Sequence, residues 1–210
     1  FSNDQKLAAI ITPAAKPSIE LRIFLLIDLK KNTIDEPAAV TNQVNNVAPN
    51  AICIGSEPVV NTVNVSPALA IPDNNVSGVS SVFAVTENVD LTDLNVDLNI
   101  NHTWVGDVIV SLQSPAGTTV VLIDRPGYTG TGFGCANNNI VAVLDDEATN
   151  PVETQCSSTP LAAINGTFIP NNALSAFDGE NTLGNWTLTV SDRAGGDTGI
   201  LNSWGLTFTS

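Results

Sequence analysis

The chain has 210 residues, of which 43% are hydrophobic and 13% are charged, a composition typical of a globular protein. No run approaches the roughly 20 apolar residues of a membrane-spanning helix, so we expect no membrane span. The net charge of −14 repels the phosphates of nucleic acids, so we also expect no nucleic-acid partner.

Charge is unevenly distributed along the chain. Residues 1–31 contain five basic and three acidic residues, a net charge of +2. Residues 32–210 contain two arginines and 18 acidic residues, a net charge of −16. Such an acidic body favours cations such as Ca²⁺ or a basic partner segment, although acids also serve simply to keep a protein in solution. Because the chain lacks Met and begins at Phe1, we expect a processed or excised chain whose secretion signal is gone.

The first predicted element is a strand over residues 18–30. Apolar residues occupy every odd position of "SIELRIFLLIDLKK", namely Ile19, Leu21, Ile23, Leu25, Ile27 and Leu29. This alternation predicts a β-strand with one fully apolar face. An unpaired strand of this kind is an aggregation hazard, so it must join a sheet. It either pairs within its own chain or completes a sheet in a neighbouring subunit.

Residues 1–58 are expected to form an arm and linker, followed by a domain over residues 59–210. Residues 32–58 are rich in Asn, Pro and Ala, which indicates irregular structure. A short strand is predicted at 59–65, and further strands separated by turns are predicted at 79–86, 94–101, 107–113, 118–124, 140–144, 163–169, 185–191 and 200–209. The pattern predicts an all-β jelly-roll β-sandwich of about eight strands with an N-terminal extended strand arm.

Three cysteines are present, and none lies in a C-x-x-C motif. Cys135 and Cys156 bracket one polar loop, so we expect them to form a disulfide in an extracellular setting. Cys53 lies outside this expected disulfide. It is either a buried free thiol or forms a disulfide between chains.

Acidic residues gather in three predicted turns. They are Asp145, Asp146 and Glu147 in "LDDEAT", Asp178 and Glu180 in "FDGEN", and Asp192 and Asp197 in "SDRAGGDTG". Ca²⁺ binds six to eight oxygens from carboxylates and loop carbonyls, and acidic Gly-rich turns offer both. None of the three has EF-hand spacing, and solvated turns in which Asp bonds its own backbone remain the alternative.

Nucleophilic catalysis is not expected. His102 is the only histidine, there is no G-x-S-x-G motif, and no cysteine has a basic neighbourhood. We interpret His102, which lies near Trp104, as a structural hydrogen-bonding residue.

Two segments resemble the P domain (homo-B domain) that follows the catalytic domain of kexin- and furin-like proprotein convertases. They are "INHTWVGDVIVSLQSPAGTTVVLIDRPG" at 100–127 and "LSAFDGENTLGNWTLTVSDRAGGDTGILNSWGLTF" at 174–208. The resemblance covers about residues 68–210, and the intervening insert is similar to the bacterial branch of the family. It implies an eight-stranded jelly roll that often binds Ca²⁺, with Trp104, Trp186 and Trp204 in the core and Asp107 bonded to a loop or facing a cation.

The family's catalytic residues sit in its protease domain, to which nothing in this chain corresponds, so the resemblance implies no enzymatic activity. We expect a secreted bacterial structural or interaction subunit, located outside the cell or at its surface. It would form homo-oligomers, as a filament or surface polymer, by donating the strand at 18–30. The alternative is an accessory P domain processed from a larger secreted subtilisin-like protease, which stabilises that protease or binds substrate.

Overall fold

The computed structural model describes residues 58–158 and 161–210. The strand predicted at 18–30 and Cys53 lie outside the described residues, as does almost all of the expected arm and linker. The first described strand begins at Val60, beside the domain boundary expected at residue 59.

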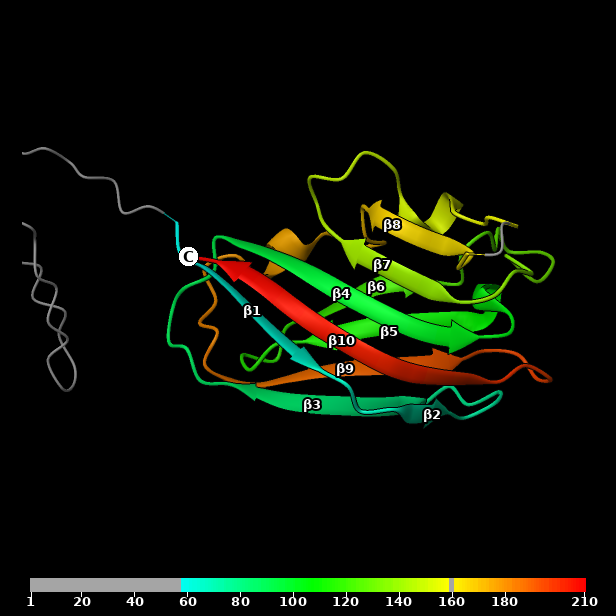
Figure 1. Ribbon diagram of the computed structural model, residues 1–210, viewed down its shortest axis with the longest axis horizontal. Coiled ribbons are helices and arrows are strands. Elements are labelled where there is room, and N and C mark those ends of the chain that lie inside the picture. The colour runs from blue at the N-terminus through cyan, green and yellow to red at the C-terminus, as the bar shows by residue number, and fades with distance from the viewer. Residues whose placement is uncertain (1–57, 159–160) are drawn as a thin grey trace, which may run out of the picture. The chain divides into compact units, whose positions relative to one another are not determined.

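The described residues form a β-sandwich of two sheets (Figure 1). The larger sheet has the order β1-β10-β4-β7-β8, and β2 also pairs with β10; its strands are β1 (Val60–Val65), β2 (Leu69–Ile71), β4 (Asp93–His102), β7 (Ile140–Leu144), β8 (Ile164–Phe168) and β10 (Gly199–Thr209). The smaller sheet has the order β3-β9-β5-β6, formed by β3 (Val79–Val85), β5 (Val108–Gln113), β6 (Thr119–Asp124) and β9 (Gly184–Asp192). All pairings are antiparallel except that of β7 with β8.

Alternation of side chains explains why these segments form strands. In β4, "DLNVDLNINH", Leu94, Val96, Leu98 and Ile100 are buried, whereas the intervening residues are more exposed. Successive side chains of a strand point to opposite faces, so this strand contributes one apolar face to the core and one polar face to the outside. The polar face becomes important below.

Aromatic side chains fill the space between the sheets. The ring of Phe83 lies 4.4 Å from that of Trp204, and the ring of Phe177 lies 5.4 Å from that of Trp186. Both buried indoles donate hydrogen bonds, from Trp204 Nε1 to Ser81 Oγ and from Trp186 Nε1 to the Thr182 carbonyl. These bonds avoid the cost of burying an unsatisfied N–H group.

The third tryptophan differs from the expectation that all three belong to the core. Trp104 is only half-buried, and its indole Nε1 donates to the carbonyl oxygen of Phe133, 2.7 Å away. Trp104 precedes the 3₁₀ turn η1 (Val105–Asp107) rather than lying within a strand, so its side chain anchors a loop.

The two long sides of the sandwich differ in how well their edge strands and core side chains are covered. Beside β6, the backbone N–H groups of Asn171 and Asn172 donate to the carbonyls of Leu122 and Val121, so the chain crosses and covers this edge. The opposite side is formed by β1, β2 and β3, toward the bottom of Figure 1. Here four inward-facing side chains are only partly buried, Val63, Val65, Val79 and Phe83, whereas Ile71 of β2 and Val85 of β3 are buried.

The predicted all-β sandwich is confirmed, with ten strands in the described residues instead of about eight. The strand at 59–65 was expected; β2, three residues long, was not. Helical structure in the described ranges is limited to η1, η2 (Val152–Thr154) and η3 (Leu174–Phe177). None of these helices is long and apolar enough to cross a membrane.

Candidate functional site

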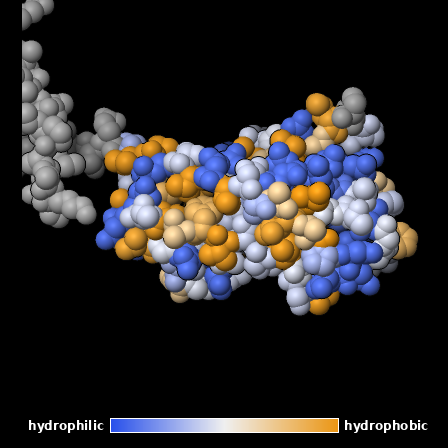
Figure 2. Space-filling view, turned by 60° about the horizontal axis from the view of Figure 1, so that its bottom comes forward, coloured by the Kyte–Doolittle hydropathy of each residue, from blue (hydrophilic) through white to orange (hydrophobic). Residues whose placement is uncertain are grey.

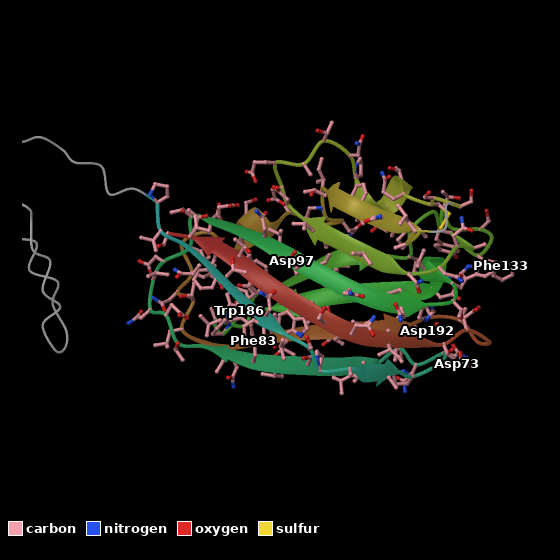
Figure 3. The ribbon with its side chains drawn as sticks, viewed as in Figure 1. Asp73, Phe83, Asp97, Phe133, Trp186 and Asp192 are labelled. Carbon is pink, nitrogen blue, oxygen red and sulfur yellow. A yellow bond between two sulfur atoms is a disulfide. The ribbon has the colours of Figure 1, made fainter. Side chains whose placement is uncertain are left out.

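The best-buried ionisable residues lie where β4 and β9 end. His102 closes β4, Asp192 closes β9, and Asp107 ends η1 between them. All three are buried, with exposed fractions of 1%, 0% and 3%. We call His102, Asp107, Arg125 and Asp192 the buried charge group. Figure 3 places Asp192 toward the right-hand end of the domain, near Asp73.

Both ring nitrogens of His102 lie close to polar groups. Its Nδ1 accepts a hydrogen bond from the Trp104 N–H at 3.1 Å and lies 2.8 Å from the Trp104 carbonyl oxygen. Its Nε2 lies 3.3 Å from Oδ2 of Asp192. The other carboxylate oxygen of Asp192 accepts the N–H of Ala194 at 3.0 Å, which fixes the turn after β9. The structure therefore confirms the structural hydrogen-bonding role expected for His102.

Asp107 faces Arg125, whose Nη2 lies 3.7 Å from the Asp107 Oδ1. Burial raises the pKa of Asp107, and the nearby carboxylate of Asp192 raises it further, while Arg125 acts in the opposite direction. Oδ1 of Asp107, Oδ2 of Asp192 and Nε2 of His102 make no hydrogen bond of good geometry with any described group. Burial and Asp192 thus disfavour the charged form of Asp107, and Arg125 partly offsets this.

The turn after β9 is also held by acids. Oδ1 of Asp197 accepts the hydroxyl of Thr103 at 2.8 Å, and the carboxylate of Asp73 accepts the N–H of Gly196 at 3.1 Å. Hydrophilic residues gather at this end of the molecule, on the right of Figure 2. Asp197 therefore lies near the buried charge group, but its carboxylate stabilises the turn.

A second acidic group lies at the opposite end of β4. Its members, which we call the acidic turn cluster, come from the start of β4, the turn after β7 and the turn after η3: Asp93, Asp145, Asp146, Glu147 and Asp178. A hydrogen bond to the Asp145 carboxyl raises the pKa of Glu147, with burial and Asp93 acting in the same direction. Burial raises the pKa of Asp178, and Asp93 and Asp146 raise it further. These carboxylates interact unfavourably with one another.

Two members of this cluster already have structural partners. The two oxygens of Asp146 accept the N–H groups of Leu174 and Ser175, each at 2.9 Å, and so cap η3. Oδ1 of Asp145 accepts the N–H of Glu147 at 2.8 Å, as in an Asx turn. Glu180, predicted with Asp178, lies apart from the cluster because its carboxylate accepts the hydroxyl of Thr118.

The expected disulfide is present. Cys135 is bonded to Cys156, with 5.5 Å between their Cα atoms. Gly106 lies directly against this loop, since a Cβ on Gly106 would come within 2.6 Å of the Phe133 carbonyl oxygen. The disulfide loop is therefore packed against the turn that carries Asp107.

Comparison with known proteins identifies the chain's family. Residues 91–208 match the family model of the proprotein convertase P-domain. The chain belongs to this family. Leupeptin-inactivating enzyme 1 of Streptomyces exfoliatus is 31% identical to this P domain over 141 residues, which are 66% of the chain and 24% of the enzyme.

Two further proteins that are similar to this P domain are proteases by name. The calcium-dependent protease of Trichormus variabilis is 28% identical over 136 residues, 63% of this chain and 16% of that protein. The serine protease of Aeromonas sobria, in complex with its chaperone, has 20% identity and a TM-score of 0.48 over 73% of this chain and 27% of that one. The P domain thus spans a quarter or less of the curated relatives it matches.

The P domain motifs converge on the buried charge group. His102 and Asp107 come from the first motif segment and Asp192 from the second, and folding brings all three together. The eight predicted cation-binding acids instead separate into this end, the acidic turn cluster and Glu180. Within residues 58–158 and 161–210, no three His, Cys, Asp or Glu side chains are gathered so that they could hold a metal ion by themselves.

The acidic turn cluster contains the type of ligand that Ca²⁺ takes in proteins, although both oxygens of Asp146 already accept backbone N–H groups. Its oxygens come from carboxylates beside turn carbonyls, and Asp145 and Glu147 interact through a hydrogen bond that a divalent cation can replace. Sequence reasoning missed Asp93 because it begins a strand, whereas its neighbours in the cluster lie in turns. It missed Asp97 of β4 for a similar reason, since a polar residue in an alternating strand is usually only solvated.

Proposed function

We propose that this P domain is a non-catalytic, extracellular interaction module that joins copies of itself by strand donation. The observation that carries the proposal is the open side of the sandwich at β1 and β3. There Val63, Val65, Val79 and Phe83 face the core yet remain partly exposed. An added strand with one apolar face would cover them and pair with a free sheet edge.

The strand predicted at 18–30 has the properties of such a donor. Thirteen residues at ~3.3 Å each extend to about 43 Å. Burial of its six aliphatic side chains at roughly 1.5–3 kcal/mol each gives ~9–18 kcal/mol before ordering costs. Residues 32–58 would serve as the tether, and a +2 arm would meet a −16 body, which favours encounter between unlike surfaces.

The test is a chain lacking residues 1–31, to which a synthetic 18–31 peptide is added. We expect the truncated chain to fold, to sediment as a monomer, and to bind the peptide with increased amide-exchange protection in β1 or β3. Full-length chain should form oligomers by sedimentation and regular fibres by electron microscopy. A truncated chain that unfolds, or a full-length chain that stays monomeric at high concentration, would show that the strand belongs to its own domain.

Two adjacent leucines provide a matched control. Leu25 lies on the apolar face of the predicted strand and Leu26 on the other face. A Leu25→Asp peptide should lose binding, whereas a Leu26→Asp peptide should retain it. Equal loss for both variants would contradict one-faced docking.

We further propose that the module binds Ca²⁺ at the acidic turn cluster. Supporting this are the raised carboxyl pKa values there and the calcium-dependent name of one relative. A cation bound only by the folded state raises its stability by mass action. Chelation should therefore lower the melting temperature, and Ca²⁺ should restore it.

Substitutions locate the calcium effect. Asp145→Asn with Glu147→Gln should abolish the Ca²⁺-dependent shift, whereas Asp124→Asn, an exposed change elsewhere, should preserve it. If Asp192→Asn or Asp197→Asn removes the shift instead, the cation binds at the other end of β4. An unchanged melting curve with and without chelator would dismiss calcium altogether.

The disulfide and the buried pair support the remaining parts of the proposal. Disulfides persist in oxidising compartments outside the cytosol, which favours an extracellular location. His102 and Asp192 have no exposed side-chain surface, so a substrate cannot reach them. The proteolytic names of the relatives support a second candidate, an accessory domain of a secreted protease, in which case the isolated chain would not polymerise.

A further inference from the structure

The outward face of the larger sheet has a polar groove around Asp97. It has a volume of about 580 Å³ and crosses β1, β10, β4, β7 and β8. Figure 3 shows Asp97 midway along the sheet, well separated from Asp192. The outward side chains that line the groove are Thr62, Asn64, Asp97, Asn99, Val141, Val143, Asn165, Thr167 and Ser203. Its size falls within the roughly 300–1,000 Å³ typical of small-ligand sites.

A glycine of β10 lies in the same row of the sheet as two of these polar side chains. Gly205 of β10 pairs with Asn64 of β1 on one side and with Asp97 of β4 on the other, and Asp97 pairs with Val143 of β7. A Cβ on Gly205 would collide with the side chain of Asn64, which leans over the glycine. Asn64 therefore covers the place where a side chain of residue 205 would lie, and Asn64 and Asp97 are the outward side chains on either side of it.

The polar groups of the groove are largely unused by the protein. Thr62 bonds Thr207, and Asn99 accepts from Asn202. In the described part of the chain, the remaining side-chain polar groups of the groove make no hydrogen bond to another protein group: Asn64, Asp97, Asn165, Thr167 and Ser203. Burial raises the pKa of Asp97, and no cation offsets that effect. Amide donors, hydroxyls and an acceptor carboxylate therefore line one surface ready for a ligand.

We propose that this groove binds a neutral, polyhydroxylated ligand, namely a stretch of uncharged polysaccharide. Asp97 would accept hydrogen bonds from sugar hydroxyls, while the amides of Asn64 and Asn165 both donate and accept. Val143, together with Val141, which is 45% exposed, would contact the apolar face of a sugar ring. Aliphatic contact in place of aromatic stacking makes the expected affinity weak.

Charge and backbone pairing argue against other ligand classes. No Lys, Arg or His lines the groove, and the surrounding body is strongly acidic, so anionic glycans and phosphates are disfavoured. An extended peptide cannot add to the middle of a sheet, because the backbone groups there already pair with neighbouring strands. A basic side chain would satisfy Asp97 alone and leave the amides and hydroxyls unused.

The experiment is a ligand-detected NMR and calorimetric titration of the full chain, which tolerates any oligomeric state. The probes are neutral hexasaccharides (cello-, xylo-, malto-, manno- and chitohexaose) and a short lysine-containing peptide. We expect at least one hexasaccharide to bind saturably at millimolar concentration. Asp97→Asn should weaken it about tenfold, the effect of one lost charge-assisted hydrogen bond.

Asp124→Asn, the same charge change on an exposed strand end, should leave the affinity unchanged, and Thr167→Val should weaken it without changing charge. Asp97→Asn is isosteric and removes no protein contact, so its folding is expected to be intact and is verified by its melting curve. Absence of binding by every hexasaccharide, or equal affinity in the Asp97 and Asp124 variants, would overturn the proposal. Binding of the lysine peptide alone would also overturn it, by assigning the groove to basic partners.

Discussion

Nε2 of His102 lies 3.3 Å from Oδ2 of Asp192, and neither side chain has exposed surface. His102 ends β4 of the larger sheet and Asp192 ends β9 of the smaller one, so this pair fastens the two sheets together at one end of the sandwich.

Removing the imidazole of His102 should therefore destabilise the folded state. His102→Ala is expected to lower the free energy of unfolding by about 3–5 kcal/mol, because it removes the partner of the buried Oδ2 of Asp192 and leaves the carboxylate with only the N–H of Ala194. The double variant His102→Ala, Asp192→Asn should recover part of this loss in urea unfolding. If the double variant is as unstable as the single one, the loss comes from packing and not from the unpaired charge.

Stability should fall as the pH rises above the ordinary carboxyl range. The folded state raises the pKa of Asp97, Asp107, Glu147, Glu153 and Asp178, in each case wholly or partly by burial. From about pH 4, where free carboxyls titrate, up to the raised values, the folded chain holds more protons than the unfolded one. The free energy of unfolding then decreases with increasing pH across that window.

Chemical unfolding at a series of pH values checks this, with chelator present throughout. Asp97→Asn should reduce the slope, since it removes one raised carboxyl, whereas Asp90→Asn should not, since Asp90 is exposed and acts on none of these five groups. A stability that climbs steadily from pH 4 to neutrality would contradict the expectation.

The close contact between Gly106 and the disulfide loop can be tested by replacing the glycine with alanine. Gly106→Ala would place its Cβ 2.6 Å from the Phe133 carbonyl oxygen, and backbone cannot rotate aside as a side chain can. We expect a loss at or above the upper end of the roughly 1–3 kcal/mol typical of overpacking. Gly195→Ala is the matched control, because its Cβ would meet Asn74 Cβ at an ordinary 3.8 Å. Similar melting temperatures for the two variants would refute the tight contact.

The disulfide should contribute stability of its own. Cys135 and Cys156 are 21 residues apart, and releasing a loop of that size costs about 3 kcal/mol in the chain-entropy account. Replacing both with Ser should lower the free energy of unfolding by this amount, whereas Cys53→Ser should change it little. Peptide mapping without reduction that recovers Cys53 linked to either residue would contradict the pairing.

Much of the fold was predictable from local pattern. Strands such as β4 alternate apolar and polar residues, and the predicted ranges for β3 to β10 agree with the structure to within a few residues. β2 was missed because three residues are too few to display a period. Trp104 was misplaced because a large aromatic residue looks the same in sequence whether it fills a core or anchors a loop.

The candidate site was harder to predict, because it depends on which strands are neighbours. The pairing of His102 with Asp192 joins residues 90 positions apart and follows from sheet topology. Likewise, the placement of Asn64 and Asp97 on either side of Gly205 arises only when β10 lies between β1 and β4. Adjacent acids in one turn attract notice in a sequence, but acids gathered from different strands do not.

The unequal sides of the sandwich limit the form that any assembly takes. The N–H groups of Asn171 and Asn172 already occupy the edge carbonyls of β6, so this side cannot accept an incoming strand there. A subunit with one donor arm and one receptive side would have two ends, and growth through them would be linear and unbranched. Copies lacking the arm would accept a neighbour without passing the contact on. If the chain assembles by strand donation as proposed, a small proportion of armless chains would shorten the fibres, and the ratio of intact to trimmed subunits would set polymer length.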